Sequence, residues 1–307
     1  MLKLHTQCRV VVDNDFSGDP DGLVGLAHHL LSPTNRVVGV TSSFLNPMFP
    51  GVTPTAADGA ALARELLAAV GGAGLPPVYA GSEVPFGEQS GSAAADAIVA
   101  EARREDELPL YVVCGGPLTN VAQVLRQAPD IASRMTLVWI GGALDAAAFE
   151  YNRDTDPEAA RFVLAHPELD VHSFPLETYR QCAYSVAELE HDLGTTGVLG
   201  RWLWDHFTDP PEWMRIGGHW PLGDSPPVLV TALTVESSQW TSTTVESGTG
   251  HRRVYTAVDL RLLFGDMLAR LRAHERSRRP VATAENRPDP AVPAADLQPA
   301  LARAQKE

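Results

Sequence analysis

Short apolar runs alternate along this chain with stretches whose apolar residues recur at helical spacing. The β-branched run Val10–Val12 predicts a buried strand, and apolar residues at intervals of three and four predict a helix from Pro20 to Leu31. By the same patterns, strands are predicted at residues 36–43, 77–81, 108–114, 136–142, 169–177 and 253–258, and helices at 55–70, 93–104, 121–126, from 157, at 226–233 and at 259–272. This alternation predicts an α/β fold that is doubly wound, with a mostly parallel sheet and flanking helices.

The repeating pattern predicts a single large domain over residues 1–273. Regularity falls between residues 185 and 222, where two helices are expected at 186–192 and 197–207, in a region expected to lie near the functional site. Residues 274–307 are rich in proline, alanine and charge and show no periodicity, which predicts a disordered tail.

Composition narrows the range of partners. The formal net charge of −14, from 24 basic and 38 acidic residues, argues against nucleic acid or an anionic membrane surface. The three cysteines, Cys8, Cys114 and Cys182, are far apart in the chain and fit free, buried thiols in a reducing compartment. No apolar run reaches the length of a membrane span and no signal peptide is recognised, so a soluble cytoplasmic protein is expected.

Three carboxylates, Asp15, Asp19 and Asp21, fall within seven residues at the predicted turn between the first strand and the first helix. In open α/β sheets, ligands bind at such carboxyl ends of strands. Carboxylates this close together raise one another's pKa unless a cation lies among them, and oxygen ligands favour Ca²⁺ or Mg²⁺ over zinc. The alternative is a purely structural role, in which Asp19 caps the helix before Pro20 and Asp21 complements the helix dipole.

Further polar residues follow the other predicted strands. Because the carboxyl ends of parallel strands share one edge of the sheet, we expect their amide and carboxylate groups to join the same site, where they suit the hydroxyls of a sugar. These residues are Asn46, Thr119, Asn120, Glu150, Asn152 and Asp224. The structural alternatives are that Asn46 stabilises its turn and Asn120 caps a helix, while Asp156 is expected to be a helix cap.

Taken in order, these motifs resemble those of the inosine-uridine-preferring nucleoside hydrolase family, from about Val10 to Leu271. The stretch DNDFSGDPDG resembles the family's D-x-D-P-G-x-D-D, VTSSFLNP its V-T-x-x-x-G-N loop, WIGGA its M-G-G-A strand end, and FEYNRDTDPEAA its E-F-N-x-x-x-D-P-E-A-A segment, while PVYAG and GGPLTN recur almost unchanged. The resemblance implies a doubly wound α/β fold and a calcium-dependent N-glycosidase that splits a nucleoside into base and free ribose. It also implies a role in purine or pyrimidine salvage and a homo-oligomer, dimer or tetramer.

The resemblance assigns the metal and catalytic roles residue by residue. It makes Asp15 a Ca²⁺ ligand and the base that deprotonates the attacking water. Asp224 and the main-chain carbonyl of Thr119 are further ligands. Pro20 separates Asp19 from Asp21, whereas the family's two aspartates are adjacent, so either acid can be the remaining ligand; we place Asp21 on the metal and Asp19 on the catalytic and substrate side.

The resemblance also assigns the sugar contacts and exposes one gap. Asn46, Glu150 and Asn152 would bind the ribose hydroxyls. Many family members carry a histidine directly before the late ligand aspartate, where it protonates the departing base, but Gly223 stands at that place here. His219, four residues upstream, is the candidate acid that we name, and the other candidates are Trp220, Tyr179 and His251.

Two other functions compete with this hypothesis. A non-catalytic member that binds a ribosyl compound is favoured by the missing histidine and the altered aspartate spacing. A phosphatase of the haloacid dehalogenase type is suggested by Asp13–Ser17, which matches a D-x-D-x-T-like nucleophile turn. That chemistry normally uses a downstream lysine, and the only lysines here are Lys3 and Lys306.

Overall fold

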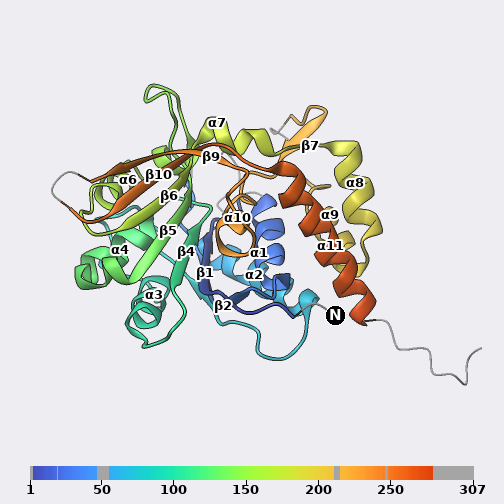
Figure 1. Cartoon of the computed structure of the whole chain (residues 1–307), viewed down its shortest axis with the longest axis horizontal. Helices are drawn as coiled ribbons and strands as arrows, with labels where there is room; N and C mark the ends of the chain where they lie inside the picture. The colour runs from blue at the N-terminus through green and yellow to red at the C-terminus, as the bar shows by residue number, and fades with distance from the viewer. Residues whose placement is uncertain (1–2, 19, 47–54, 211–214, 246–247, 279–307) are drawn as a thin grey trace, which may run out of the picture. The chain divides into compact units, whose positions relative to one another are not determined.

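A central sheet of eight strands organises the computed structural model, which describes residues 3–18, 20–46, 55–210, 215–245 and 248–278 (Figure 1). The strand order is β3-β2-β1-β4-β5-β6-β10-β9, and all neighbouring strands are parallel except β9 and β10. The strands are β1 (Cys8–Asn14), β2 (Asn35–Ser42), β3 (Val78–Ala80), β4 (Leu110–Cys114), β5 (Met135–Ile140), β6 (Asp170–Phe174), β9 (Gln239–Thr244) and β10 (His251–Ala257). The predicted doubly wound, mostly parallel architecture is confirmed.

Helices cover both faces of this sheet. They are α1 (Asp21–Leu31), α2 (Ala56–Val70), α3 (Ala93–Arg103), α4 (Thr119–Gln127), α5 (Tyr151–Thr155), α6 (Pro157–Leu164), α7 (Leu176–Tyr179), α8 (Val186–Thr195), α9 (Val198–Asp205), α10 (Pro227–Thr231) and α11 (Leu260–Arg278), with short 3₁₀ turns at Pro129–Arg134 and Arg180–Cys182. A two-stranded sheet joins β7 (Ala183–Ser185) to β8 (His219–Pro221). Contacts group the described residues up to Glu275 into one compact unit.

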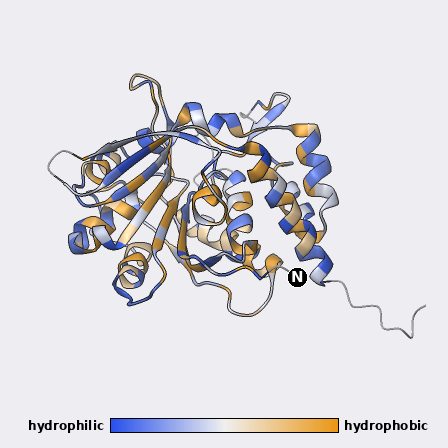
Figure 2. Ribbon diagram, viewed as in Figure 1, coloured by the Kyte–Doolittle hydropathy of each residue, from blue (hydrophilic) through white to orange (hydrophobic). Residues whose placement is uncertain are grey.

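Two apolar cores hold the layers together. Side chains alternate along β1, so Val10 and Val12 belong to one core and Val11 to the other. The first core contains residues of α1, α2, α8, α9 and α11, and the second contains residues of α3, α4 and α6. Figure 2 shows the apolar colour concentrated along central strands such as β4 and β5, as burial on both faces requires.

Several predicted boundaries need correction. Helix α4 begins at Thr119 rather than Val121, and α11 continues through His274 to Arg278, so the predicted disorder is wrong for residues 274–278. The rest of that predicted tail lies outside the described residues. Strand β9 was not predicted, because its sequence QWTSTT alternates weakly and most of its side chains are exposed. The three cysteines are free and buried, as expected.

The strand order reverses beside β1, which pairs with β2 on one side and with β4 on the other. Helix α1 follows β1 into the first core, whereas α4 follows β4 into the second, so the two connections leave the sheet toward opposite faces. Such a switch point opens a crevice at the carboxyl ends of the strands, where α/β proteins bind ligands. The turns after β1 and β4 therefore flank the expected site.

A fully buried carboxylate holds the strand ends together at this switch point. Asp13 Oδ1 accepts hydrogen bonds from Thr41 Oγ1 at 2.5 Å and Asn120 Nδ2 at 2.8 Å, and Oδ2 accepts from Ser43 Oγ at 2.7 Å and Cys114 Sγ at 3.3 Å. Burial raises the pKa of Asp13, and the four hydrogen bonds oppose that rise. Because Asp13 has no solvent exposure, it is not available as the nucleophile that a dehalogenase-type phosphatase requires.

Asn120 belongs to this buried network and is not a helix cap. Its amide nitrogen also donates to the Ser42 carbonyl at 3.1 Å, and its Oδ1 accepts from the Ser82 amide at 3.2 Å. Leu118 takes the cap position of α4, without a capping side-chain hydrogen bond. The expectation that Asn120 caps a helix was therefore wrong. Its side chain instead joins β1, β2 and the loop after β3.

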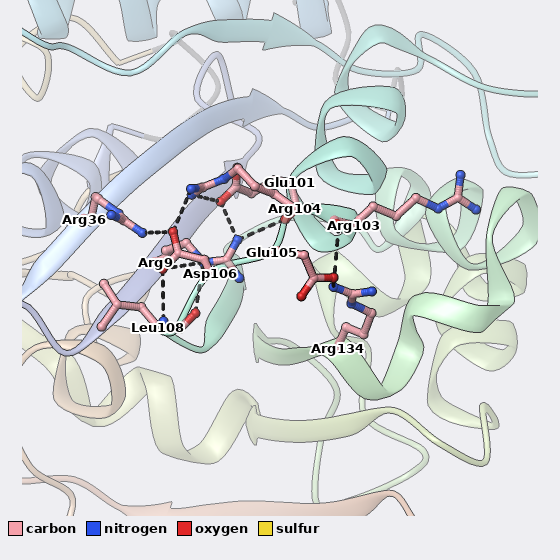
Figure 3. Close-up of polar contacts among 9 residues, drawn as sticks. All are labelled: Arg9, Arg36, Glu101, Arg103, Arg104, Glu105, Asp106, Leu108 and Arg134. Atoms are coloured by element: carbon pink, nitrogen blue, oxygen red, sulfur yellow. Dashed lines mark hydrogen bonds and ion pairs between the residues drawn. The ribbon is translucent and has the colours of Figure 1, made fainter.

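At the opposite edge, ion pairs join the amino ends of β1 and β4 to α3 (Figure 3). Arg9 is 4% exposed, pairs with Glu101 at 2.6 Å, and donates to the Leu108 carbonyl at 3.0 Å. Arg104 bridges Glu101 and Asp106, and Arg36 reaches the same Asp106. Since positive and negative side chains alternate and pair in this cluster, its role is to fix the strand ends.

Replacing Arg9 with methionine tests the contribution of this cluster to stability. The variant Arg9→Met keeps the apolar stem but removes the donor to the main-chain carbonyls of Leu108 and Glu101 and one of the donors to the Glu101 carboxylate, so we expect a loss of about 2 kcal/mol of unfolding free energy. The matched control is Arg103→Met, because Arg103 forms an exposed pair with Asp130 at 3.4 Å and is expected to contribute less than about 1 kcal/mol. Equal urea midpoints for the two variants would contradict this account.

Charge at the switch point is tested by Asn120→Asp. The variant places a second buried carboxylate against Asp13 and removes the donor, so we expect a loss of at least about 3 kcal/mol at pH 7. Mutual repulsion raises the folded-state pKa of the pair above the unfolded value. The loss of unfolding free energy relative to the wild type therefore becomes smaller as the pH falls and the pair takes up a proton. In Asn120→Ala, which adds no charge, the loss of unfolding free energy changes less with pH. Denaturant unfolding between pH 7 and pH 5 measures both variants, and parallel curves would refute the charge argument.

Candidate active site

The turn after β1 carries the first of the predicted acids. Asp15 is buried at the end of the strand, and its carbonyl accepts a hydrogen bond from the Gly18 amide at 2.7 Å. Phe16, which stands where the resemblance leads one to expect proline, is 1% exposed and packs in the first core. The altered turn is thus held by an apolar side chain. Asp19 lies outside the described residues.

Asp21 and Asp224 lie next to each other although 203 residues separate them in the chain. Asp21 is the first residue of α1, and its Oδ2 accepts a hydrogen bond from the Asp224 amide at 3.0 Å. Asn14 Nδ2 donates to Asp224 Oδ2 at 2.8 Å, while the buried Asn14 Oδ1 accepts no hydrogen bond from any described residue. The late aspartate therefore joins the turn after β1.

Glycine after β4 makes this approach possible. A Cβ atom on Gly115 would lie 2.1 Å from Asn14 Nδ2 and 2.9 Å from Asp224 Cγ, so no larger residue fits there without moving both side chains. Gly115 also accepts a hydrogen bond from Asn152 Nδ2 at 3.2 Å, and the same nitrogen donates to the Ile140 carbonyl at 2.8 Å. Asn152 thereby joins the ends of β4 and β5.

Glu150 occupies the next position around the site and is 1% exposed. Its Oε1 accepts from the Asn152 amide at 3.2 Å and its Oε2 accepts from the Gly142 and Arg153 amides at 2.8 and 2.9 Å. Glu150 is thus the cap of α5, a short helix that the sequence pattern did not predict. Burial raises the pKa of Glu150, and the amide hydrogen bonds oppose that rise.

Tyr179, at the end of α7, closes the ring of contacts. Its hydroxyl donates to Glu150 Oε1 at 3.2 Å, and its Cδ2 atom lies 3.1 Å from the position of a Cβ on Gly223, the residue before Asp224. Burial and the neighbouring Glu150 carboxylate raise the pKa of the Tyr179 hydroxyl, which keeps it protonated at neutral pH. The ring therefore runs from Asp21 through Asp224, Asn14, Gly115, Asn152, Glu150 and Tyr179 to Gly223.

The other residues expected at the site are placed as follows. Asn46 is half-buried in the loop after β2, and Thr119 begins α4, where its hydroxyl donates to Asp156 Oδ2 at 2.6 Å. Asp156 caps α6, as predicted. His219 is exposed on β8, where it lies opposite Ser185 of the antiparallel strand β7.

The described carboxylates do not form a metal site by themselves. Among the residues that the structure describes, no three His, Cys, Asp or Glu side chains gather closely enough to hold a metal ion. The Asn14 amide contacts Asp224 through its nitrogen, and its buried oxygen accepts no hydrogen bond from a described residue. A cation bound here would therefore also use amide or main-chain oxygens, which suits a hard ion such as Ca²⁺.

Sequence reasoning missed the roles of Asn14, Gly115 and Tyr179. The glycine pair directly after an apolar strand was a usable signal, because glycine at a strand end often marks a close approach of backbone and side chains. Tyr179 was named only as one candidate among several. Its contact with Gly223 joins residues 44 positions apart, and no local sequence pattern indicates such a contact. Within the described part of the chain, no helix has the length and apolar character needed to cross a bilayer.

Comparison with known proteins bears on the family and the fold of the chain. The family model for the inosine-uridine preferring nucleoside hydrolases matches residues 10–290. A pyrimidine-specific ribonucleoside hydrolase, RihA, from Salmonella schwarzengrund is 37% identical over 86 residues, which cover 26% of this chain and 27% of that protein. RihA from Escherichia coli is 39% identical over 71 residues, or 22% and 23% of the two chains. The aligned segments thus span about a quarter of these curated relatives.

Solved structures extend the similarity to the whole fold. An inosine-guanosine nucleoside hydrolase superposes with a TM-score of 0.66 at 19% identity, covering 87% of this chain and 98% of its own. A plant nucleoside hydrolase gives 0.68 at 19% identity, with 87% and 99% covered. A purine-preferring ribonucleoside hydrolase from Gardnerella vaginalis gives 0.64 at 18% identity, with 88% and 99% covered. At these identities the structures establish the shared fold, and the family model, which matches most of the sequence, establishes the relationship: this chain belongs to the inosine-uridine preferring nucleoside hydrolase family.

Proposed function

We propose that this protein hydrolyses the N-glycosidic bond of a ribonucleoside and releases ribose and the free base. The observation that carries the proposal is the closed ring of contacts at the switch point, which brings Asp21, Asp224 and the Glu150–Asn152 turn together from three separate segments. The relatives act on nucleosides according to their names, and they differ in the base that those names specify. The proposed bond is therefore the one to ribose, and the preferred base is found by measurement.

The family is metal-dependent, and we propose that Ca²⁺ binds between the turns after β1 and β4. The proposed ligands are Asp15, Asp21, Asp224 and the main-chain carbonyl of Thr119. Because no three such side chains in the described part of the chain gather closely enough to hold an ion, the three carboxylates would have to draw together around it. Three features support the fit: the donors are oxygens, Asp21 and Asp224 adjoin, and the buried Asn14 Oδ1 has no hydrogen-bond donor among the described residues. When bound, the cation would hold the ribose diol and acidify a water molecule.

The chain's own residues would perform the remaining steps. Asp15 takes a proton from the attacking water, whose oxygen forms a bond to the anomeric carbon as the bond to the base nitrogen breaks. Positive charge develops on the sugar ring in this step, and the surrounding carboxylates, including Asp19 in our assignment, stabilise it. Asn46, Glu150 and Asn152 bind the ribose hydroxyls and orient the ring.

The cellular setting follows from the same proposal. A cytoplasmic enzyme of purine or pyrimidine salvage would take free nucleosides as substrates and return the base and ribose to metabolism. The acidic net charge of −14 remains unfavourable for nucleic acid as a partner. From the family resemblance we also propose that the protein forms a homodimer or homotetramer. Light scattering would measure its mass in solution.

Ribose release from a panel of nucleosides tests the function directly. We expect reducing sugar from at least one of inosine, adenosine, guanosine, uridine and cytidine in the presence of Ca²⁺, loss of that activity after chelation, and recovery when Ca²⁺ is restored. Bound Ca²⁺ with no turnover of any nucleoside would instead favour the ribosyl-binding alternative, whose motivation is the glycine at position 223.

Two substitutions separate chemistry from binding. Asp15→Asn removes the proposed base and a metal ligand, so we expect kcat to fall by at least about 100-fold and Ca²⁺ affinity to weaken. Asn152→Ala removes a proposed ribose contact, so we expect mainly KM to rise, by about tenfold. The variant also loses the hydrogen bonds to the Gly115 and Ile140 carbonyls, so its stability is measured beside its kinetics. Asp130→Asn is the matched control, because Asp130 lies on the surface beside Arg103. Wild-type turnover in Asp15→Asn would show that the proposed site is wrong.

A further inference from the structure

The carboxylate of Glu150 already accepts as many hydrogen bonds as it has lone-pair sites. Each of its oxygens accepts two: Oε1 from the Asn152 amide and the Tyr179 hydroxyl, and Oε2 from the Gly142 and Arg153 amides. Three of these four donors are main-chain groups fixed by the loop and by the first turn of α5. The Tyr179 hydroxyl is the one side-chain donor of the four.

A ribose hydroxyl that binds Glu150 must therefore replace one of these donors. The main-chain amides cannot leave without opening the loop or unwinding α5, because Glu150 caps that helix. The Tyr179 hydroxyl forms one of the two longest of the four hydrogen bonds, at 3.2 Å, and a small rotation of the side chain releases it. Sugar binding is thus expected to free a phenol hydroxyl beside the substrate.

The ring of Tyr179 lies where a side chain at position 223 would otherwise project. A Cβ on Gly223 would be 3.1 Å from Tyr179 Cδ2, a tight contact, and 3.6 Å from Asp21 Oδ2. A histidine at this position would have to displace the tyrosine ring. Gly223 and Tyr179 are therefore compatible with each other, and the aromatic ring takes the space between α7 and the proposed metal ligands.

We propose that Tyr179 binds the departing base: its hydroxyl, released from Glu150 by a ribose hydroxyl, donates a hydrogen bond to the base as the glycosidic bond breaks. This inference rests on the proposed function. The bonding electrons of the glycosidic bond pass to the base nitrogen, the water oxygen bonds to the anomeric carbon, and the proton taken by Asp15 returns through solvent to the base. Tyr179 keeps its proton and stabilises the negative charge that develops on the base.

His219 is the competing donor that the sequence suggested. It is exposed on β8, whereas the Tyr179 hydroxyl is in direct hydrogen-bond contact with Glu150, the residue that we assign to ribose. The geometry thus favours Tyr179, because a donor to the base must lie beside the sugar that carries it.

The test compares two leaving groups in the variant Tyr179→Phe, which keeps the ring and loses only the hydroxyl. One substrate is the best natural nucleoside of the panel, and the other is 4-nitrophenyl β-D-ribofuranoside, whose nitrophenolate departs as a stable anion without a donor. We expect kcat for the nucleoside to fall by about 100-fold and kcat for the nitrophenyl riboside to stay near the wild-type value. The ratio of the two values does not depend on the amount of folded enzyme.

The control variant is Tyr184→Phe, because the Tyr184 hydroxyl donates to Asp192 at 2.5 Å, outside the ring of site contacts. We expect its ratio of the two kcat values to equal that of the wild type. An equal loss on both substrates in Tyr179→Phe, or no loss on either, would overturn the role of Tyr179 while leaving the hydrolase intact. Failure of the wild-type protein to hydrolyse either substrate would overturn the proposed function, and this inference with it.

Discussion

The buried carboxylate of Asp13 is the constraint on which the site depends. It sits at the end of β1 with no solvent exposure and is stabilised by donors from β2, β4, α4 and the loop after β2. A carboxyl group in this position is tolerated only because four hydrogen bonds replace its water, and those bonds fix the strand ends relative to one another. Because the end of β1 is fixed, the position of Asp15, two residues later, is also restricted.

Glycine allows the second half of the site to assemble on that framework. Gly115 lets Asn14 and Asp224 approach within hydrogen-bond distance, and Asn152 ties the same glycine to the end of β5. Five segments far apart in the sequence thereby meet around one point. Because these segments pack closely, a change in the size of one residue in the ring requires its neighbours to move.

The sequence was most informative where a pattern is local. The apolar runs predicted the buried parallel strands, and the order of short motifs predicted both the family and the edge of the sheet that carries the polar residues. The cap role of Asp156 was also local, since Asp-Pro-Glu has a characteristic place at the start of a helix, and it was confirmed.

Contacts between distant segments could not be inferred in the same way. The sequence suggests a cap role for Asn120, whereas in the fold the side chain donates to Asp13, because the helix starts one residue before it. The contact of Tyr179 with Gly223 likewise depends on how α7 packs, which no spacing encodes. The lost histidine was visible as a gap in a motif, and the residue that fills its space became visible only in three dimensions.

The most direct test of the account is a crystal structure of the protein with Ca²⁺ and ribose. The account predicts the cation at about 2.3–2.6 Å from oxygens of Asp15, Asp21 and Asp224 and from the Thr119 carbonyl, with a ribose hydroxyl on Glu150. It also predicts that the Tyr179 hydroxyl has moved away from Glu150. A cation or sugar bound elsewhere, or a ligand shell without Asp15 and Asp224, would contradict the central claim.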